Sequence, residues 1–104
     1  MRNKPSYDGY TLKLPNSDGE MEDVGSLTAG PNLLRLLSLK AFVYEAETGR
    51  VSVRLERKAR GSSQGYWVAY RRIRGKLQKR YICEAYALEP YVLDWAARCL
   101  LPNA

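Results

Sequence analysis

The chain has 104 residues, of which 45% are hydrophobic and 27% are charged, and it contains no histidine. This length predicts one domain that can bury a core without disulfides or a bound metal. The net charge of +6 favours an acidic partner, while the absence of histidine, of a phosphate-binding loop and of suitably spaced carboxylate pairs argues against an enzyme and predicts no cofactor.

The first 30 residues carry five acidic side chains against three basic ones, with several glycines and prolines. Their few, scattered apolar residues predict a poorly ordered acidic segment before a domain at residues 31 to 104. Residues 10 to 14, YTLKL, are suited to a short edge strand. The acidic cluster at residues 18 to 23 is either a solvated tail, which is favoured, or a segment that folds back on a basic surface.

A short helix is predicted for residues 31 to 39, because Pro31 suits a first helical position and the following leucines have helical spacing. Residues 41 to 59 then predict a β-hairpin that turns at Thr48 and Gly49, with the alternative that its first run continues the preceding helix. Apolar and polar residues alternate in its second strand, so one face of that strand is expected to be buried.

Residues 65 to 81, GYWVAYRRIRGKLQKRY, hold six Arg and Lys and four aromatic rings but no acid. Their β-branched and aromatic residues, with the pair Arg74 and Gly75, predict a second hairpin with a tight turn. Residues 89 to 101 predict an amphipathic helix in which Trp95 seats the helix on the sheet.

The predicted fold class is α+β: a small antiparallel three-stranded β-sheet packed on a C-terminal α-helix, preceded by a short helix and the poorly ordered segment. One helix covers one face of such a sheet and leaves the other face to solvent or a partner. With a two-residue turn, the face expected against the helix carries Tyr66, Val68, Tyr70, Arg72, Leu77, Lys79, Tyr81 and Cys83. The face expected to be open carries Trp67, Ala69, Arg71, Ile73, Lys76, Gln78, Arg80 and Ile82. A longer turn would change these pairings, so the register stays open.

Basic charge is concentrated in residues 50 to 82, which hold eleven Lys and Arg against Glu56 alone, a balance of +10. A solubilising surface normally mixes both signs, so this asymmetry favours nucleic-acid binding. Lys and Arg neutralise phosphates, Arg and Gln contact base edges, and a two-stranded ribbon fits the major groove. The candidate contact residues are Arg54, Lys58, Trp67, Arg71, Arg74, Lys76, Gln78 and Arg80.

The second hairpin also carries a pattern of glycines, aromatics and basic residues: Gly65, Trp67, Tyr70, Arg71, Gly75, Lys76, Lys79, Arg80 and Tyr81. With the helix that follows, it resembles the arm-type DNA-binding domain of tyrosine recombinases over residues 50 to 100. That domain is similar in layout to the plant ethylene-response-factor DNA-binding domain. The resemblance implies double-stranded DNA binding by the open face of a sheet, without strand cleavage. It fits an accessory or regulatory factor of a mobile element, or a small transcription regulator.

Two other functions stay open. Trp67, Tyr70 and Tyr81 are candidates for stacking on single-stranded DNA or RNA, and a basic sheet also suits an acidic protein partner. Cys83 and Cys99 are expected to be ordinary thiols rather than a disulfide. No apolar run resembles a signal peptide or a membrane span, so no membrane partner is expected. We expect a cytoplasmic protein, associated with the nucleoid if it binds DNA.

Overall fold

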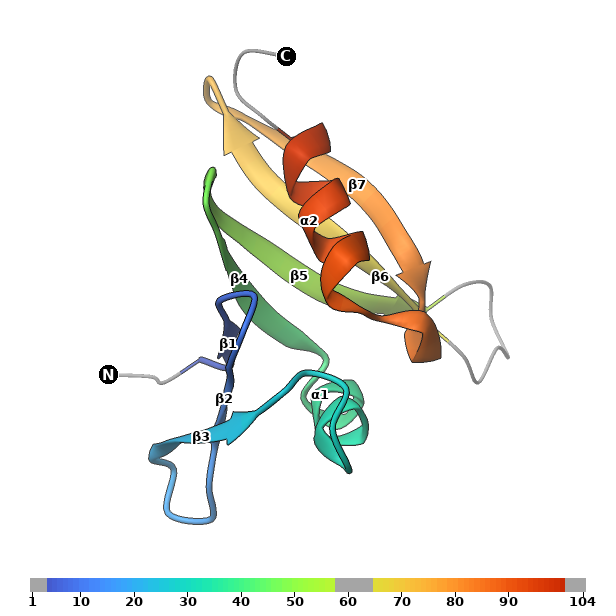
Figure 1. The fold of residues 1–104 in the computed structure, drawn as a ribbon. Helices are drawn as coiled ribbons and strands as arrows, with labels where there is room; N and C mark the ends of the chain where they lie inside the picture. Colours follow the sequence, from blue (N-terminus) through green and yellow to red (C-terminus); the bar gives the residue numbers. More distant parts are fainter. Residues whose placement is uncertain (1–3, 58–64, 101–104) are drawn as a thin grey trace.

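In the computed structural model, which describes residues 4–57 and 65–100, the chain forms one seven-stranded mixed β-sheet with two α-helices (Figure 1). The strands are β1 (Ser6–Tyr7), β2 (Leu12–Pro15), β3 (Met21–Gly25), β4 (Ala41–Ala46), β5 (Gly49–Arg57), β6 (Gly65–Ile73) and β7 (Lys76–Glu84). The helices are α1 (Asn32–Leu39) and α2 (Pro90–Cys99), with the 3₁₀ helix η1 (Ala85–Ala87) before α2. The strand order is β3-β2-β1-β4-β5-β6-β7, and β1 and β4 are its parallel pair.

The predicted three-stranded sheet is wrong, because the segment expected to be poorly ordered supplies three strands and residues 41 to 46 form a strand instead of continuing the preceding helix. In β2, Leu12 and Leu14 are fully buried while Lys13 between them is exposed, so this strand has the alternation of a half-buried sheet. The short strand expected at residues 10 to 14 is therefore real, but it lies between β1 and β3 rather than at an edge. β1 joins this N-terminal hairpin to β4.

Turn chemistry explains why a polar, glycine-rich segment is ordered. The Asp8 carboxylate accepts hydrogen bonds from the backbone N–H groups of Tyr10 and Thr11, at 2.8 and 2.7 Å. These bonds hold the pKa of the Asp8 carboxyl below its usual value. Gly9 supplies the positive φ of 97° that the turn requires. Residues that sequence reasoning took as marks of disorder are therefore turn residues.

The later elements agree with the prediction. β6 and β7 are joined by Arg74 and Gly75, whose φ angles of 52° and 82° are the positive pair expected of a tight hairpin turn. The β4–β5 turn uses Glu47 and Thr48, one residue earlier than predicted. α1 and α2 coincide with the two predicted helices to within two residues at each end.

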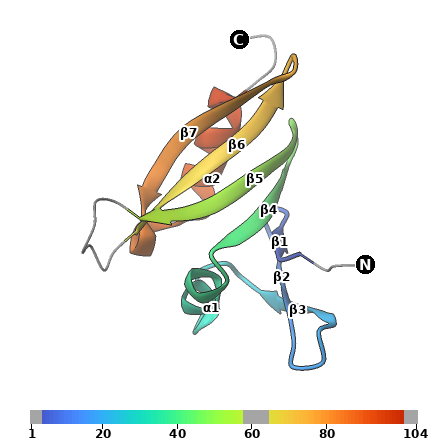
Figure 2. The same ribbon diagram turned by 180° about the vertical axis from the view of Figure 1, so that it is seen from behind.

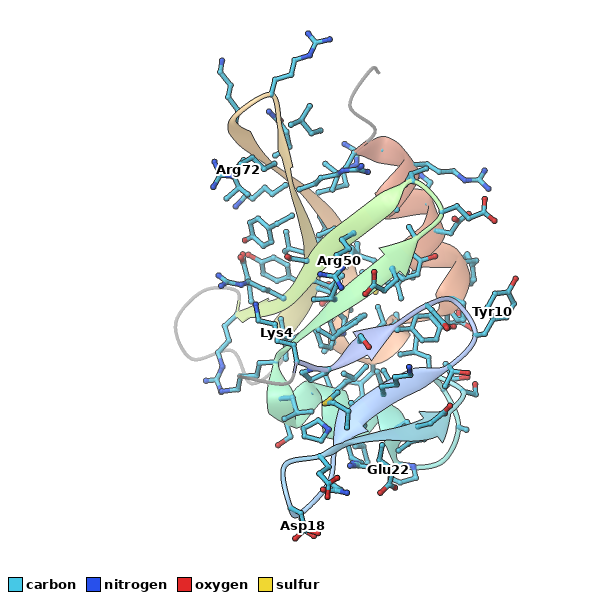
Figure 3. All side chains as sticks on the ribbon, turned by 90° about the vertical axis from the view of Figure 1, so that its left-hand side faces the viewer. Lys4, Tyr10, Asp18, Glu22, Arg50 and Arg72 are labelled. Atoms are coloured by element: carbon cyan, nitrogen blue, oxygen red, sulfur yellow. The ribbon has the colours of Figure 1, made fainter. Side chains whose placement is uncertain are left out.

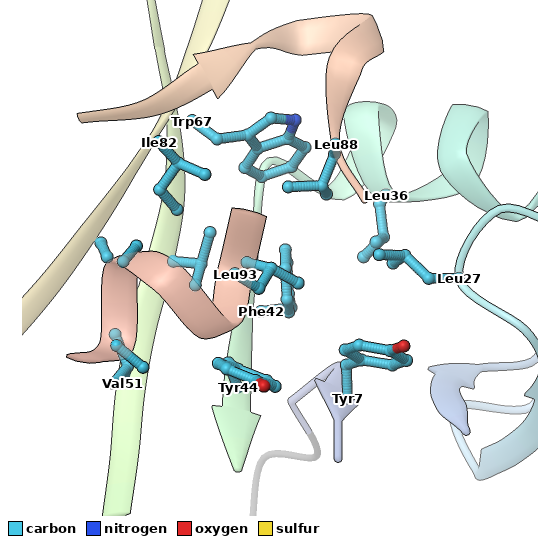
Figure 4. Close-up of a cluster of buried hydrophobic side chains, with 14 of the residues drawn as sticks. Tyr7, Leu27, Leu36, Phe42, Tyr44, Val51, Trp67, Ile82, Leu88 and Leu93 are labelled. Carbon is cyan, nitrogen blue, oxygen red and sulfur yellow. The ribbon is translucent and has the colours of Figure 1, made fainter. Parts of the chain in front are cut away.

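The hydrophobic core lies between α2 and one face of the sheet, and it extends to α1 and the N-terminal strands (Figure 4). Trp67 is its largest member and is 0% exposed. Its ring meets the Phe42 ring edge-on at a centroid distance of 5.5 Å, and its Nε1–H donates to the Ala85 carbonyl at 3.0 Å. Leu36 of α1 and Tyr7 of β1 belong to the same cluster, so the N-terminal strands share the core of the later hairpins.

α2 covers only one face of β4 to β7, and Figure 2 shows the opposite face of these strands without a helix over it. The helix is buried through Leu93, Ala96 and Ala97. Trp95, predicted to seat the helix, is 46% exposed. Small side chains let a helix approach a sheet closely, whereas an indole at the contact would hold the helix away.

Candidate nucleic-acid interface

The two faces of the β6–β7 hairpin are the reverse of those predicted. Trp67 and Ala69 are buried on the α2 side, whereas Tyr66 and Tyr70 lie on the uncovered side and are partly exposed. The physical reason is hydrogen bonding: the indole has one N–H, which the Ala85 carbonyl satisfies. A face of tyrosines would bring several hydroxyl groups into the core, and each would need a partner. The proposed surface role of Trp67 is therefore wrong.

A β-bulge accounts for the rest of the misplaced register. Trp67 is opposite Cys83, but Val68 is opposite Tyr81, so Ile82 is an extra residue in β7. Ile82 and Cys83 are consequently both buried, although adjacent strand residues normally point to opposite faces. Burial raises the pKa of the Cys83 thiol to about 11. Both cysteines are free thiols, as expected.

The uncovered side of β4 to β7 is called the open face below. Strand register and alternation place on it Ala41, Val43, Glu45, Arg50, Ser52, Arg54, Glu56, Tyr66, Val68, Tyr70, Arg72, Leu77, Lys79, Tyr81 and Glu84. Aromatic and cationic groups alternate across this surface. The Tyr66 and Tyr81 rings are 5.7 Å apart, and the Arg54 guanidinium lies 6.0 Å from the centre of the Tyr70 ring. The Tyr70 hydroxyl donates to the Glu56 carboxylate.

The turn end of the second hairpin projects beyond its neighbouring strand. β5 pairs with β6 only as far as Ser52 and Tyr70, whereas β6 and β7 stay paired to Ile73 and Lys76. Residues 71 to 78 thus form a two-stranded segment, named the free ribbon here, whose tip lies beyond β5 in Figures 1 and 2. It contains four basic residues, Arg71, Arg72, Arg74 and Lys76, and no acid.

Several predicted contact residues are on these surfaces. Arg74, Lys76 and Gln78 are exposed on the free ribbon, with Arg74 in the turn. Arg54 is exposed on the open face. Lys58 lies outside the described residues. The structure therefore brings the ribbon residues together, and it places Arg54 two strands away from β7.

Arg71 and Arg80 lie on the α2 side, not on the open face where they were predicted. The Arg71 Nη2 group donates to the Thr48 carbonyl at 2.6 Å, so this side chain ties the ribbon to the β4–β5 turn. The Arg80 guanidinium lies 5.2 Å from the centre of the Trp95 ring, a cation–π contact with α2. Both arginines hold the hairpin against the rest of the fold.

Sequence reasoning missed Arg72, Lys79 and Leu77 as surface residues because it placed them against the helix. All three are exposed on the open face, Leu77 to 59%. Tyrosine content alone does not identify this face, because the core also buries Tyr7 and Tyr44.

The acidic cluster at residues 18 to 23 and the free ribbon lie at opposite ends of the molecule. In Figure 3, Asp18 and Glu22 lie at the β2–β3 end, and Arg72 lies toward the far end, near the free ribbon. The acidic cluster is therefore part of an ordered hairpin, and it does not fold back onto the basic surface.

The open face also contains a hollow of about 240 Å³ near the start of β1. Its lining residues are Lys4, Pro5, Ala41, Phe42, Val43, Ser52, Val53 and Arg54. The hollow carries basic groups and no acidic group among these lining residues.

Comparison with protein-family models, with curated proteins and with solved structures finds no match. The resemblance to the arm-type domain therefore remains a prediction. Neither α1 nor α2, the two α-helices within residues 4–57 and 65–100, has the length and apolar character needed to cross a bilayer.

Proposed function

We propose that this protein binds double-stranded DNA by placing the free ribbon in the major groove. The observation that carries the proposal is the extension of β6 and β7 beyond their pairing with β5, which exposes Arg72, Arg74 and Lys76 and contains no acid. The major groove, about 12 Å wide, admits a two-stranded β-ribbon.

The exposed side chains of this region suit duplex recognition. Arg72, Arg74, Lys76 and the adjacent Lys79 are available to neutralise backbone phosphates. Arg72 and Gln78 also have the donor geometry for base edges, and Leu77 offers an apolar contact for a thymine methyl group. These contacts supply both affinity and sequence preference.

Side-chain contacts fix the position of the free ribbon in the protein without DNA. Arg71 fixes one side of it to Thr48, and Arg80 on the neighbouring stretch of β7 contacts Trp95 of α2. A rigid ribbon loses little conformational entropy on binding, which favours affinity.

Fluorescence anisotropy of a labelled duplex, titrated with protein at several salt concentrations, tests this function. Four phosphate contacts predict a slope of log K against log salt of about −3.6. The double variant Arg72→Ala/Lys79→Ala should make this slope shallower by about 1.8 and weaken binding at every salt concentration.

The matched control is Lys13→Ala/Arg98→Ala, which removes the same charge from exposed positions on β2 and α2. The control should bind nearly as the native protein does. The proposal is refuted if the native protein shows no salt-dependent binding. It is also refuted if the two double variants lose duplex affinity equally.

Single-stranded nucleic acid is the second candidate, favoured by the Tyr66–Tyr81 pair on the open face, where Tyr81 is 48% exposed. Bases stack on exposed aromatic rings, at about 1–3 kcal/mol per base. Competition between a duplex and a single strand of equal length separates the two functions. Preference for the single strand, lost on Tyr81→Ala but kept on Arg72→Ala/Lys79→Ala, would favour this candidate.

A further inference from the structure

The hollow beside β1 is a second basic feature of the open face, separate from the free ribbon. Lys4 and Arg54 both line it, although they are distant in the sequence. Lys4 is held there by the backbone, because the Val43 N–H donates to the Pro5 carbonyl at 2.9 Å and so fixes the start of β1 against β4.

The shape of the hollow follows from the residues that form it. Ala41 lies opposite Arg54, and Val43 lies opposite Ser52, so small side chains occupy its middle. The two cations and the Ser52 hydroxyl are the polar side chains among its lining residues. Glu56, two residues from Arg54 on the same face, accepts from the Tyr70 hydroxyl and does not line the hollow. Cations and a hydroxyl donor are the groups that bind an oxyanion such as phosphate.

The distance from the ribbon suits a duplex. Ser52 is opposite Tyr70, so Arg54 and Arg72 are separated by about four residues along the strands and by one strand spacing. Four residues of strand span roughly 13 Å, and the one spacing between β5 and β6 lies at right angles and measures roughly 5 Å, so Arg54 lies roughly 14 Å from Arg72. The major groove is about 12 Å wide and about 8.5 Å deep, so a side chain at its floor beside one wall lies roughly 15 Å from the opposite backbone, which is the distance at which the hollow would lie.

We infer that the Lys4–Arg54 hollow binds a backbone phosphate of the same duplex, beside the groove that the free ribbon occupies. The inference rests on the proposed function and adds a second contact to it. The hollow fixes the orientation of the ribbon along the groove, because two separated contacts define a direction where one does not.

Two variants test the hollow in the anisotropy assay. Lys4→Ala/Arg54→Ala removes its cations, and Ala41→Leu fills it at an exposed position without changing the charge. Loss of one phosphate contact should make the salt slope shallower by about 1 in both variants, with affinity reduced about tenfold at low salt. Lys13→Ala/Arg98→Ala is again the charge-matched control and should retain the native slope.

A readout other than affinity is the backbone amide spectrum, in which the signals of Ala41, Val43 and Ser52 should shift on duplex addition. Native binding and native slopes in both hollow variants overturn the inference and leave the ribbon proposal standing. If duplex addition shifts the amide signals of the free ribbon but not those of Ala41, Val43 and Ser52, the inference is likewise overturned and the ribbon proposal stands. Failure of the native protein to bind duplex overturns both.

Discussion

Trp67 gives the sharpest test of which hairpin face is buried. The side chain is fully buried, packs edge-on against Phe42 and donates to the carbonyl of Ala85, itself a buried residue. Trp67→Ala removes this packing and should lower the free energy of unfolding by about 3–5 kcal/mol. Since a small domain has only about 5–15 kcal/mol in total, this loss is a large share of the stability, and the urea midpoint should fall well below that of the native protein.

Trp67→Phe is the milder change, because it keeps an aromatic ring but leaves the Ala85 carbonyl without its donor. An unpaired buried acceptor costs about 1–3 kcal/mol, which corresponds to a fall in Tm of roughly 8 to 16 °C for a loss near 2 kcal/mol. Urea unfolding followed by far-ultraviolet circular dichroism measures both variants without relying on tryptophan fluorescence.

Trp95 offers a matched control, since it is the other tryptophan and is 46% exposed. Trp95→Ala removes its contact with Arg80 and should cost about 1 kcal/mol. Equal urea midpoints for native protein and Trp67→Ala, or a larger loss for Trp95→Ala, would show that the assignment of faces is wrong.

Three further expectations follow from single contacts. A Cβ at Gly65 would lie 2.6 Å from the Glu56 carbonyl oxygen, so Gly65→Ala should lower the unfolding free energy by about 1–3 kcal/mol in urea titrations. The pKa of the Cys83 thiol is raised by burial to about 11, against 9.0 as its ordinary value, so the unfolded chain loses this proton first and stability should fall as pH rises from 9 to 11. Cys83→Ala should flatten that part of the stability–pH curve, and an unchanged curve would contradict the assignment. Glu56→Gln removes a carboxylate from the open face and should strengthen duplex binding several-fold in the anisotropy assay, whereas weaker binding would count against an anionic partner.

Local sequence patterns predicted the elements that depend on neighbouring residues. The Arg74–Gly75 turn follows from turn chemistry and the two helices from helical spacing, and all three were located to within two residues. The N-terminal strands were missed because β1 pairs with β4, far along the chain, and no local pattern encodes that contact. Leu12 and Leu14 alternate around Lys13, but so short an alternation has little weight without the core that it joins.

The candidate site was predicted in its chemistry but not in its geometry. The basic character of the β6–β7 hairpin follows from its composition, as does its two-residue turn. The face assignment failed because the alternation of residues along β6 and β7 defines two faces without indicating which face α2 covers. The bulge at Ile82 then moved Cys83 to the other set, and a single extra residue of this kind leaves no mark in composition.

β1 is two residues long, yet it connects the β2–β3 hairpin to the rest of the sheet. So short a strand makes few hydrogen bonds, so the N-terminal hairpin is the part of the sheet most easily detached in a local opening. Lys4 precedes β1, and Arg54 lies on β5, on the other side of β4. An anion bound by both side chains would therefore bridge the junction between β1 and β4. A ligand that binds only the closed form stabilises that form by mass action, and duplex binding would therefore slow amide exchange in β1 and β2, far from the ribbon itself.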